Sequence, residues 1–221
     1  MAVISFCSAK GGVGKSTAAI NLAVYFQKQN KSVYLIDADA DVKSSSKWLG
    51  RRKKEKIKGT QATGDLLDLI SEIAPNYDYV IIDNQGKNDD TVISSLVCSD
   101  FCIANLKPSY FDSETIPEIT KVVKRSQHFN PKLKMKMLIN GASTNKAVKE
   151  AQEVEALLNE LNLERFETIL HERKAYRDTL GYGEGVLEIE KPNGSQSKAL
   201  DEINHLGEEV LRWNGEKARV I

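Results

Sequence analysis

The sequence contains little of what several protein classes depend on. Its 221 residues include 3 cysteines and 5 prolines, and aromatic side chains make up 7%. The cysteines, Cys7, Cys98 and Cys102, are too few for a disulfide-stapled mini-protein, and their spacing lacks the paired ligands of a zinc site. No apolar run approaches the roughly 18 residues of a membrane span, and the first residues lack a secretion signal. These absences predict a protein of the cytosol with reduced thiols.

Net charge is absent as well, because 31 Lys and Arg balance 31 Asp and Glu. The hydrophobic fraction of 41% is that of an ordinary globular protein, which excludes disordered and collagen-like chains. A chain of this length buries roughly 70% of the surface that it exposes when unfolded. No internal repeat, low-complexity tract or linker divides it, so the sequence predicts a single domain over residues 1–221.

The neutral total hides a basic segment. Residues 43–58 read KSSSKWLGRRKKEKIK, with eight basic residues against one acid, Glu55. A local positive field can attract an anionic polymer even when the molecule as a whole is neutral. The same composition is also typical of a solvated loop, and the sequence leaves both interpretations open.

Apolar segments alternate with amphipathic ones along the chain. Short apolar, β-branched runs predict strands, and apolar residues spaced three and four apart predict helices. The expected strands are 3–8, 32–37, 78–83, 101–105 and 134–139. The expected helices are 16–29, 64–73, 90–98, 115–128, 146–161 and 195–213. This alternation predicts an α/β three-layer domain, in which helices flank a mainly parallel, twisted sheet.

A glycine-rich loop directly follows the first expected strand. Residues 10–17 read KGGVGKST and open the first helix, which is the context of a phosphate-binding P-loop. Glycines let backbone N–H groups turn toward a phosphate, and the helix N-terminus adds its partial positive charge. Lys15 is then placed to reach the β- and γ-phosphates of ATP, and the Ser16 hydroxyl to ligate Mg²⁺. The sequence therefore predicts ATP and Mg²⁺ as ligands of this loop.

The loop departs from the usual P-loop pattern, because Ala9 stands at the position of the first glycine and Lys10 follows it. With this change, KGGVGKST resembles the deviant P-loop of the ParA/MinD superfamily of ATPases. The resemblance implies that Lys10 reaches across an ATP-bound homodimer to the phosphates held by the other subunit. A second cation there would stabilise charge on the transferring phosphoryl group, as an arginine finger does.

Aspartates at the ends of two expected strands are similar to further motifs of this superfamily. Asp37-Ala38-Asp39 resembles its switch I, which implies that Asp39 orients the attacking water and that Asp37 supports the Mg²⁺ shell. Asp83 resembles the Walker B aspartate, which implies another metal contact. The two residues after Asp39 differ from the Pro-Gln pair of the family, so we expect an altered hydrolysis rate. The alternative for each aspartate is a helix cap or turn.

The resemblance implies three sets of site residues. The catalytic set is Lys10, Lys15 and Asp39, and the metal set is Ser16, Asp37 and Asp83. Pro108 lies in a loop similar to the family's proline-containing loop near the nucleotide, and Asn140 stands where the family presents an asparagine to adenine, although such an asparagine also caps turns. The implied nucleotide-binding set is Gly11, Gly12, Val13, Gly14, Lys15, Ser16, Thr17, Pro108 and Asn140.

Several relatives within the superfamily fit the sequence poorly. The last residues, LRWNGEKARVI, lack the apolar face of a MinD-like membrane helix. Cys98 and Cys102 are more simply packed thiols than ligands of an iron–sulfur cluster. The histidines have no serine or cysteine nearby in a nucleophile context, so a hydrolase triad is unsupported.

The chain most resembles a small ParA protein of plasmid or chromosome partition. This implies an ATPase that dimerises on ATP, binds DNA without sequence preference and hydrolyses slowly until a centromere-binding adaptor of the ParB type stimulates it. We therefore expect a cytoplasmic protein that associates with the nucleoid in its ATP state, has no membrane partner and forms a homodimer or a higher polymer.

Two basic clusters are the candidate DNA contacts. Contacts to phosphates make such binding salt-sensitive and indifferent to sequence. The second cluster is equally typical of an exposed helix face. The candidate residues are Arg51, Arg52, Lys53 and Lys54 in the first cluster and Arg173, Lys174 and Arg177 in the second.

Three other functions remain compatible with the sequence. A conjugation-associated ParA-like ATPase would recruit a DNA-transfer complex with the same motifs. A metabolic amidoligase of the same fold would need a carboxylate substrate and would ignore DNA. A nucleotide-regulated binding protein would bind ATP and hardly hydrolyse it.

Overall fold

The computed structural model describes residues 1–86, 89–108, 115–144 and 147–218. The strands are β1 (Ala2–Cys7), β2 (Val33–Ala38), β3 (Lys58–Gln61), β4 (Tyr79–Asn84), β5 (Phe101–Leu106), β6 (Lys134–Ala142) and β7 (Leu170–His171). The α-helices are α1 (Lys15–Lys28), α2 (Ser44–Arg51), α3 (Leu67–Ile73), α4 (Asp90–Val97), α6 (Ile116–Gln127), α7 (Ala147–Glu160), α8 (Lys174–Gly181) and α9 (Gly194–Trp213). Two short 3₁₀ turns are η1 (Ala74–Asn76) and η2 (Val186–Glu188).

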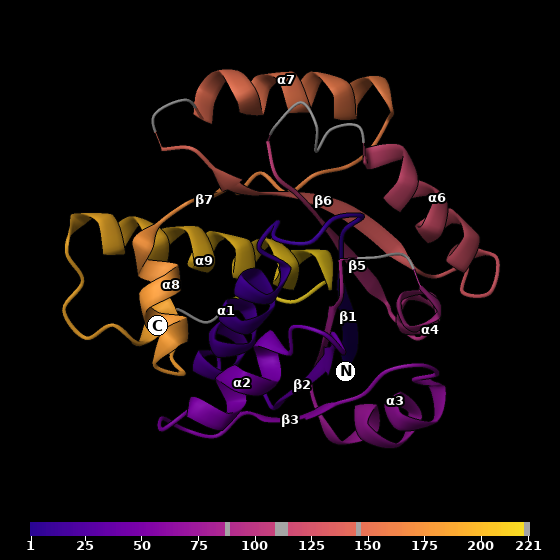
Figure 1. Cartoon of the computed structure of the whole chain (residues 1–221), viewed down its shortest axis with the longest axis horizontal. Coiled ribbons are helices and arrows are strands. Elements are labelled where there is room, and N and C mark those ends of the chain that lie inside the picture. The colour runs from indigo at the N-terminus through magenta and orange to yellow at the C-terminus, as the bar shows by residue number, and fades with distance from the viewer. Residues whose placement is uncertain (87–88, 109–114, 145–146, 219–221) are drawn as a thin grey trace.

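The strands form one sheet in the order β3-β2-β4-β1-β5-β6-β7, and every pair is parallel. Figure 1 shows α1, α2, α8 and α9 on one side of the sheet and α3, α4 and α6 on the other. A parallel sheet needs such helical crossovers, because consecutive parallel strands cannot be joined by a tight turn. The predicted three-layer α/β architecture is confirmed.

Side chains of β1 show how both faces of the sheet are buried. Ile4 and Phe6 pack in the cluster that contains α1 and α9, whereas Cys7 packs with α4 and α6. All six residues of β1 are buried, as are all six of β4 and of β5. The central strands therefore read as mostly apolar runs, and the charged residue of β4, Asp83, lies near its carboxyl end, where loops meet.

Four elements were not predicted from the sequence. The basic segment 43–58 contains the short helix α2 and leads into β3, whose sequence KGTQ is polar because it lies at the edge of the sheet. The two-residue strand β7 and the eight-residue helix α8 are too short for a clear apolar period. No described helix is both long and apolar enough to cross a membrane.

Candidate nucleotide-binding site

The loop between β1 and α1 is shaped by two glycines in the left-handed backbone region. Gly12 has a φ of 77° and Gly14 a φ of 85°, a conformation in which a side chain would be strained. Gly14 is also the N-cap of α1 and has no side chain to occupy the first N–H groups of the helix. These N–H groups and the helix dipole therefore favour an anion in front of the loop.

Lys15 is held inside this loop by a residue that the sequence did not single out. Its side chain is buried, and Nζ donates to Ser8 Oγ at 2.9 Å. Ser8 Oγ in turn donates to the carbonyl oxygen of Lys10 at 2.6 Å, which ties the start of the loop to its end. Burial lowers the pKa of the Lys15 ammonium, and the carboxylate of Asp83 opposes that shift. The ammonium is thus positioned at the phosphate site before any nucleotide arrives.

Asp83 supplies a buried carboxylate next to the loop. The strand register pairs it with Asp37 of the neighbouring strand, and the Ser45 hydroxyl donates to its Oδ2 at 2.7 Å. Burial raises the pKa of Asp83 to about 6, while the hydroxyls of Ser45 and Ser16 pull the pKa back down. The buried Oδ1 has no hydrogen-bond partner among the described residues. A carboxylate oxygen left without a partner beside a serine hydroxyl suits a hydrated divalent cation, so these residues fit Mg²⁺.

Asp37, which the resemblance assigns to the metal set, accepts backbone N–H groups through both of its carboxylate oxygens. Its Oδ1 accepts the N–H of Asp39 at 3.1 Å, and its Oδ2 accepts the N–H of Ser46 at 2.6 Å. Asp39 Oδ1 accepts the N–H groups of Asp41 and Val42 at 3.0 and 2.8 Å. Asp37 therefore shapes the switch I loop and binds the first turn of α2. Its predicted support of the Mg²⁺ shell stays a prediction.

The segment that follows β4 lies in close contact with the P-loop. A Cβ at Gly86 would lie 2.5 Å from the backbone nitrogen of Gly11, closer than atoms can approach. Only glycine fits at this contact without moving the loop. Asn84 anchors the same segment, because its Nδ2 donates to the Phe6 carbonyl at 3.1 Å.

A groove lies beside the P-loop. Its walls include Gly12, Thr17, Asn140 and Arg177. Asn140 Nδ2 donates to the Gly14 carbonyl at 3.0 Å, so the predicted base-contacting residue touches the loop directly. Pro108 is buried at the end of β5 and does not line this groove. Of the loop at 106–112 that contains it, residues 109–112 lie outside the described ranges.

A carboxylate from α9 organises one wall of this groove and was not found from the sequence. Glu202 accepts from His171 Nδ1 at 2.7 Å, from Tyr176 OH at 2.8 Å and from Arg173 Nη2 at 2.6 Å. Burial raises the pKa of the Tyr176 hydroxyl, and so does the neighbouring carboxylate. No sequence motif marks Glu202, because it lies about thirty residues from its partners and inside an ordinary amphipathic helix.

The structure corrects two of the predicted DNA contacts. The Arg52 side chain is only 2% exposed and forms a two-pronged ion pair with Glu188, with both N···O distances at 2.9 Å. It also stacks over Trp48 at 4.8 Å from the ring centroid. The Arg173 side chain is 10% exposed and paired with Glu202. Both guanidinium groups are largely buried and paired with a carboxylate, so neither is available to contact DNA.

The remaining basic residues come together although they lie far apart in the sequence. A groove between α1, α2 and α8 contains Lys47, Arg51 and Arg177, with Ser16 of the P-loop also on its wall. Lys174 is exposed on α8, one turn before Arg177. We call the exposed cations Lys47, Arg51, Lys174 and Arg177 the α2–α8 surface. Lys53 and Lys54 are exposed just beyond it, and Lys54 lies 3.9 Å from both Glu184 and Glu190.

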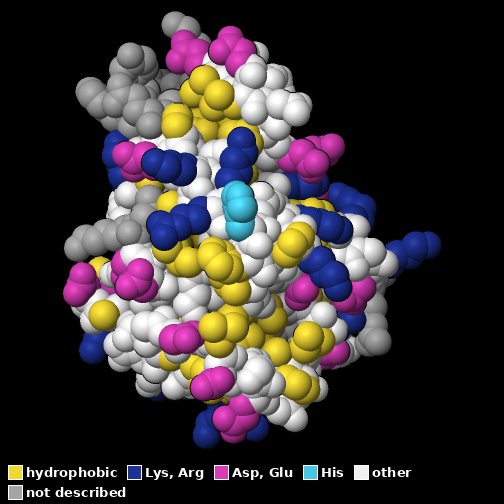
Figure 2. All heavy atoms as spheres, turned by 90° about the vertical axis from the view of Figure 1, so that its right-hand side faces the viewer, with side chains coloured by type: hydrophobic (Ala, Val, Ile, Leu, Met, Phe, Trp, Pro, Cys, Tyr) yellow, Lys and Arg dark blue, Asp and Glu magenta, His cyan; other side chains and the backbone are white. Residues whose placement is uncertain are grey.

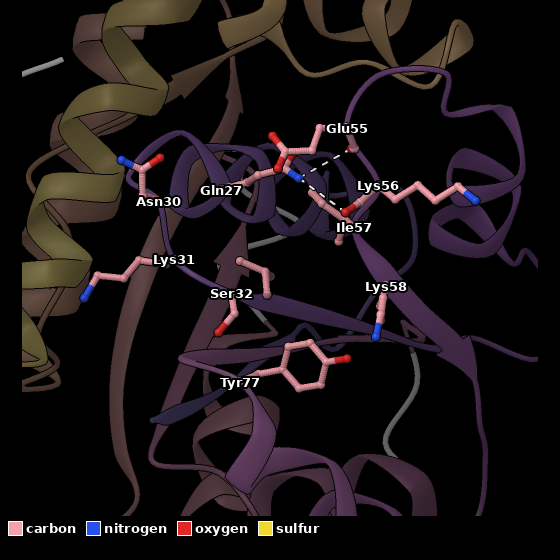
Figure 3. A pocket seen from close by; sticks show the side chains of 10 residues that line it. Gln27, Asn30, Lys31, Ser32, Glu55, Lys56, Ile57, Lys58 and Tyr77 are labelled. Atoms are coloured by element: carbon pink, nitrogen blue, oxygen red, sulfur yellow. Dashed lines mark hydrogen bonds between the residues drawn. The ribbon is translucent and has the colours of Figure 1, made fainter.

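A second hollow, of about 390 Å³, lies at the opposite end of the sheet (Figure 3). It is bordered by the end of α1 and the starts of β2 and β3, and Gln27 Nε2 spans it with weak bonds of 3.4 Å to the carbonyls of Glu55 and Lys56. Lys31 is paired with Glu216. This hollow faces away from the P-loop and contributes nothing to phosphate binding.

Among the described residues, no group of three or more His, Cys, Asp or Glu side chains gathers as a closed metal cage. This agrees with the way P-loop proteins hold Mg²⁺, where a hydroxyl, one carboxylate, water and the phosphates share the ion.

Comparison with known proteins decides the family. A family model described as the CobQ/CobB/MinD/ParA nucleotide binding domain matches residues 4–186. The chain belongs to this family. The predicted superfamily is thereby confirmed, and nucleotide binding is the property that its members share.

Relatives within the CobQ/CobB/MinD/ParA family include partition proteins. An uncharacterised protein of Methanocaldococcus jannaschii is 30% identical over 183 residues, which cover 61% of this chain and 71% of that protein. The chromosome partitioning protein ParA of Myxococcus xanthus is 24% identical over 260 residues, covering 98% and 90%.

Solved structures share the fold. A chain of the MinC:MinD cell division protein complex from Aquifex aeolicus matches with a TM-score of 0.77 at 20% identity, covering 100% of this chain and 99% of that one. Cobyrinic acid a,c-diamide synthase from Mycobacterium smegmatis, solved with ADP and magnesium, matches with a TM-score of 0.72 at 15% identity, covering 100% and 99%. At these identities the likeness establishes the architecture alone.

Proposed function

We propose that this family member is a Mg²⁺-dependent ATPase of DNA partition, which dimerises on ATP and binds DNA without sequence preference. In this proposal a ParB-type adaptor stimulates a slow basal hydrolysis. The observation that carries it is the direct connection between the phosphate site and a basic helix. The full-length likeness to a ParA partition protein favours the same function.

In this proposal, the P-loop binds the phosphates and two side chains beside it hold Mg²⁺. The P-loop N–H groups and Lys15 bind the phosphates, while Ser16 and Asp83 hold Mg²⁺. Bound Mg²⁺ would neutralise charge that develops on the phosphates. Asp39 orients the attacking water, and Lys10, which is exposed at the start of the loop, reaches the phosphates of the other subunit.

The connection to DNA runs through the first turn of α2. Asp83 accepts a hydrogen bond from Ser45, and Asp37 accepts one from Ser46, so both switch carboxylates hold the same helix. When Asp83 turns toward a nucleotide-bound cation, Ser45 loses or shares its acceptor. The position of α2, and with it the basic side chains that α2 carries, then depends on the nucleotide.

The α2–α8 surface is the proposed DNA contact. Its two ion pairs, Lys174 with Asp178 and Arg177 with Glu172, are both 3.3 Å long and exposed. Exposed pairs contribute little free energy, so these cations can exchange a carboxylate for a DNA phosphate at small cost. The same groove is lined by Ser16 of the P-loop and by Arg51 and Arg177 of this surface, so the two are neighbours.

The decisive experiment measures binding of a fluorescent 40-base-pair duplex without nucleotide, with ADP and with ATP, at several salt concentrations. We expect binding only with ATP, loss of binding in Lys10→Ala, and a log–log salt slope of about −0.9 for each neutralised phosphate. Equal binding in all three states, or none in any, would refute nucleotide-gated DNA binding and favour the amidoligase or recruitment functions.

A charge-reversal pair locates the surface. Arg51→Glu with Arg177→Glu should lower ATP-dependent DNA affinity at least about tenfold, because two phosphate contacts become repulsive. Lys191→Glu with Lys198→Glu is the matched control, since it changes the charge equally at exposed positions on and before α9. Sedimentation in ATP should show the same dimer for both variants. Unchanged DNA binding in the first variant would remove the α2–α8 surface from the proposal.

A further inference from the structure

A second cationic surface lies on the opposite face of the sheet from α2 and α8. The helix α6 carries Lys121, Lys124, Arg125 and His128 along one of its faces, at intervals of three, one and three residues. Figure 2 shows Lys and Arg side chains gathered across the middle of this side of the molecule, with hydrophobic side chains above and below them. The inner face of α6 packs in the core through Ile116, Ile119 and Val123, so this cationic face is its solvent side.

These cations border an apolar groove of about 570 Å³ between α6 and the segment that follows α7. Leu161 and Leu163 form the wall opposite the cations, and the Leu161 side chain is 44% exposed. The lining contains no carboxylate among the described residues. We call this feature the α6 groove: one wall is positive and the other is apolar.

Among the residues that the structure describes, the cations of the α6 groove have no ion-pair partner, in contrast to Lys174 and Arg177 on α8. Within the described part of the chain, no ion pair is formed by Lys121, Lys124 or Arg125. His128 Nδ1 lies 2.9 Å from the Lys124 carbonyl oxygen, which can only accept, so Nδ1 donates. No described carboxylate therefore neutralises these three charges, although Lys124 and Arg125 lie in the last turn of α6, where a cation favours the helix dipole.

We propose that the α6 groove is the docking site of a partner protein segment, an amphipathic helix whose row of Leu, Ile or Phe side chains is bordered on one side by Asp or Glu. The apolar row would cover Leu161 and Leu163, and the carboxylates would pair with Lys121, Lys124 and Arg125. This is the pattern of a helix in a groove, with charge setting orientation and apolar contact setting affinity. The proposal is independent of nucleotide and DNA.

Other occupants suit the α6 groove less well. A second copy of this chain would bring a second set of the same cations into the interface, and the described lining offers no carboxylate to pair with them. Duplex DNA would use the cations but would gain nothing from the exposed leucines. A bilayer would need a wider apolar surface than two leucines. Because α2 and α6 pack on opposite faces of the sheet, a partner at α6 and DNA at the α2–α8 surface could bind together.

The test uses the full chain and a panel of fluorescein-labelled 18-residue helical peptides that place leucines along one stripe and glutamates along its border. Scrambled peptides of identical composition are the controls. We expect fluorescence anisotropy to show a patterned peptide binding at least about tenfold more tightly than its scrambled form. Lys121→Glu with Lys124→Glu should abolish that difference, and so should Leu161→Asp, whereas Lys191→Glu with Lys198→Glu should leave it intact.

Several results would overturn the proposal. They are an absence of binding across the whole panel, equal binding of patterned and scrambled peptides, and equal loss in the control variant. Displacement of the peptide by duplex DNA or by anionic phosphatidylserine vesicles, with the same sensitivity to Lys121→Glu and Lys124→Glu, would assign the α6 groove to those ligands instead. Far-UV circular dichroism of each variant checks that the fold is retained. Leu161→Asp removes the apolar contact and the lysine pair removes the charge, so the two variants test the proposal independently.

Discussion

At the scale of single residues, the phosphate site is built from groups whose burial is unfavourable without a ligand. Lys15 and Asp83 are both buried, and burial lowers the pKa of the first and raises the pKa of the second. Ser8 and Ser45 hold the two side chains in place. The apo protein therefore stores at this site an electrostatic cost that a phosphate and a cation would relieve.

Asp83→Asn is expected to stabilise the apo protein while removing Mg²⁺-dependent nucleotide binding. The folded pKa of Asp83, about 6, lies above the unfolded value of 3.8. The ionised carboxylate therefore destabilises the folded state fully above about pH 6, and protonation removes this penalty as the pH falls toward 4. A shift of about two units corresponds to at most about 3 kcal/mol, reduced by the lost attraction to Lys15.

Urea unfolding in EDTA across pH 4 to 8 measures this effect. The gap in unfolding free energy between Asp83→Asn and the unaltered protein should open between pH 4 and 6 and then stay constant. Asp201→Asn, a carboxyl-to-amide change at an exposed position of α9, is the control and should show no such gap. A destabilised Asp83→Asn at neutral pH would contradict the argument.

At the scale of elements, α2 is fixed at both ends by side chains of other segments. Its first turn binds Asp37 and Asp83, and just beyond its last turn Arg52 pairs with Glu188 of η2. Trp48 lies between, 1% exposed, and donates to the Glu184 carbonyl at 3.1 Å. A helix of eight residues is not stable alone, so these contacts determine whether it forms.

Arg52→Ala should therefore be strongly destabilising although it lies in a run of basic residues. Removing one partner of a buried ion pair costs about 3–5 kcal/mol, because the other charge stays buried. Arg51→Ala, at the neighbouring exposed position, should change the unfolding free energy by less than about 0.5 kcal/mol. Urea unfolding compares the two variants directly, and Arg52→Met with Glu188→Leu should recover part of the loss. Equal effects at positions 51 and 52 would show that the pair is not buried in solution.

At the scale of the whole molecule, one core cluster crosses most of the sheet. It joins α1, α2, α8 and α9 to the strands β1, β2, β4, β5, β6 and β7. Trp48 lies at one end of this cluster, and Trp213 packs at the other end on Phe101, with ring centroids 4.5 Å apart. The single domain expected from the sequence implies that both ends unfold together.

Single-tryptophan variants test this cooperativity. In Trp48→Phe the remaining fluorescence reports on Trp213, and in Trp213→Phe it reports on Trp48. In each variant, the urea midpoint from fluorescence should coincide with that from far-UV circular dichroism, as expected for two-state unfolding. Midpoints that separate in either variant would indicate two cooperative units within residues 1–221.

The sequence by itself determined the sheet, the P-loop and the family. The central buried strands are mostly apolar runs and their crossover helices have apolar residues at helical spacing, and a phosphate loop needs glycines, a lysine and a serine in adjacent positions. Lys15, Ser16 and Asp83 could therefore be predicted to meet, since carboxyl ends of neighbouring parallel strands lie together. Short or polar elements such as α2, β3 and α8 could not be predicted from the sequence, because tertiary contacts rather than a local pattern stabilise them.

Only the tertiary structure decided which charges are available. Arg51 and Arg52 are indistinguishable in sequence, yet one is exposed and the other is buried against Glu188, 136 residues away. Ser8, Ser45 and Glu202 bear no motif, and their importance follows from the partners that folding brings to them. Burial and pairing are properties of distances across the chain, and a linear pattern of residue types does not contain those distances.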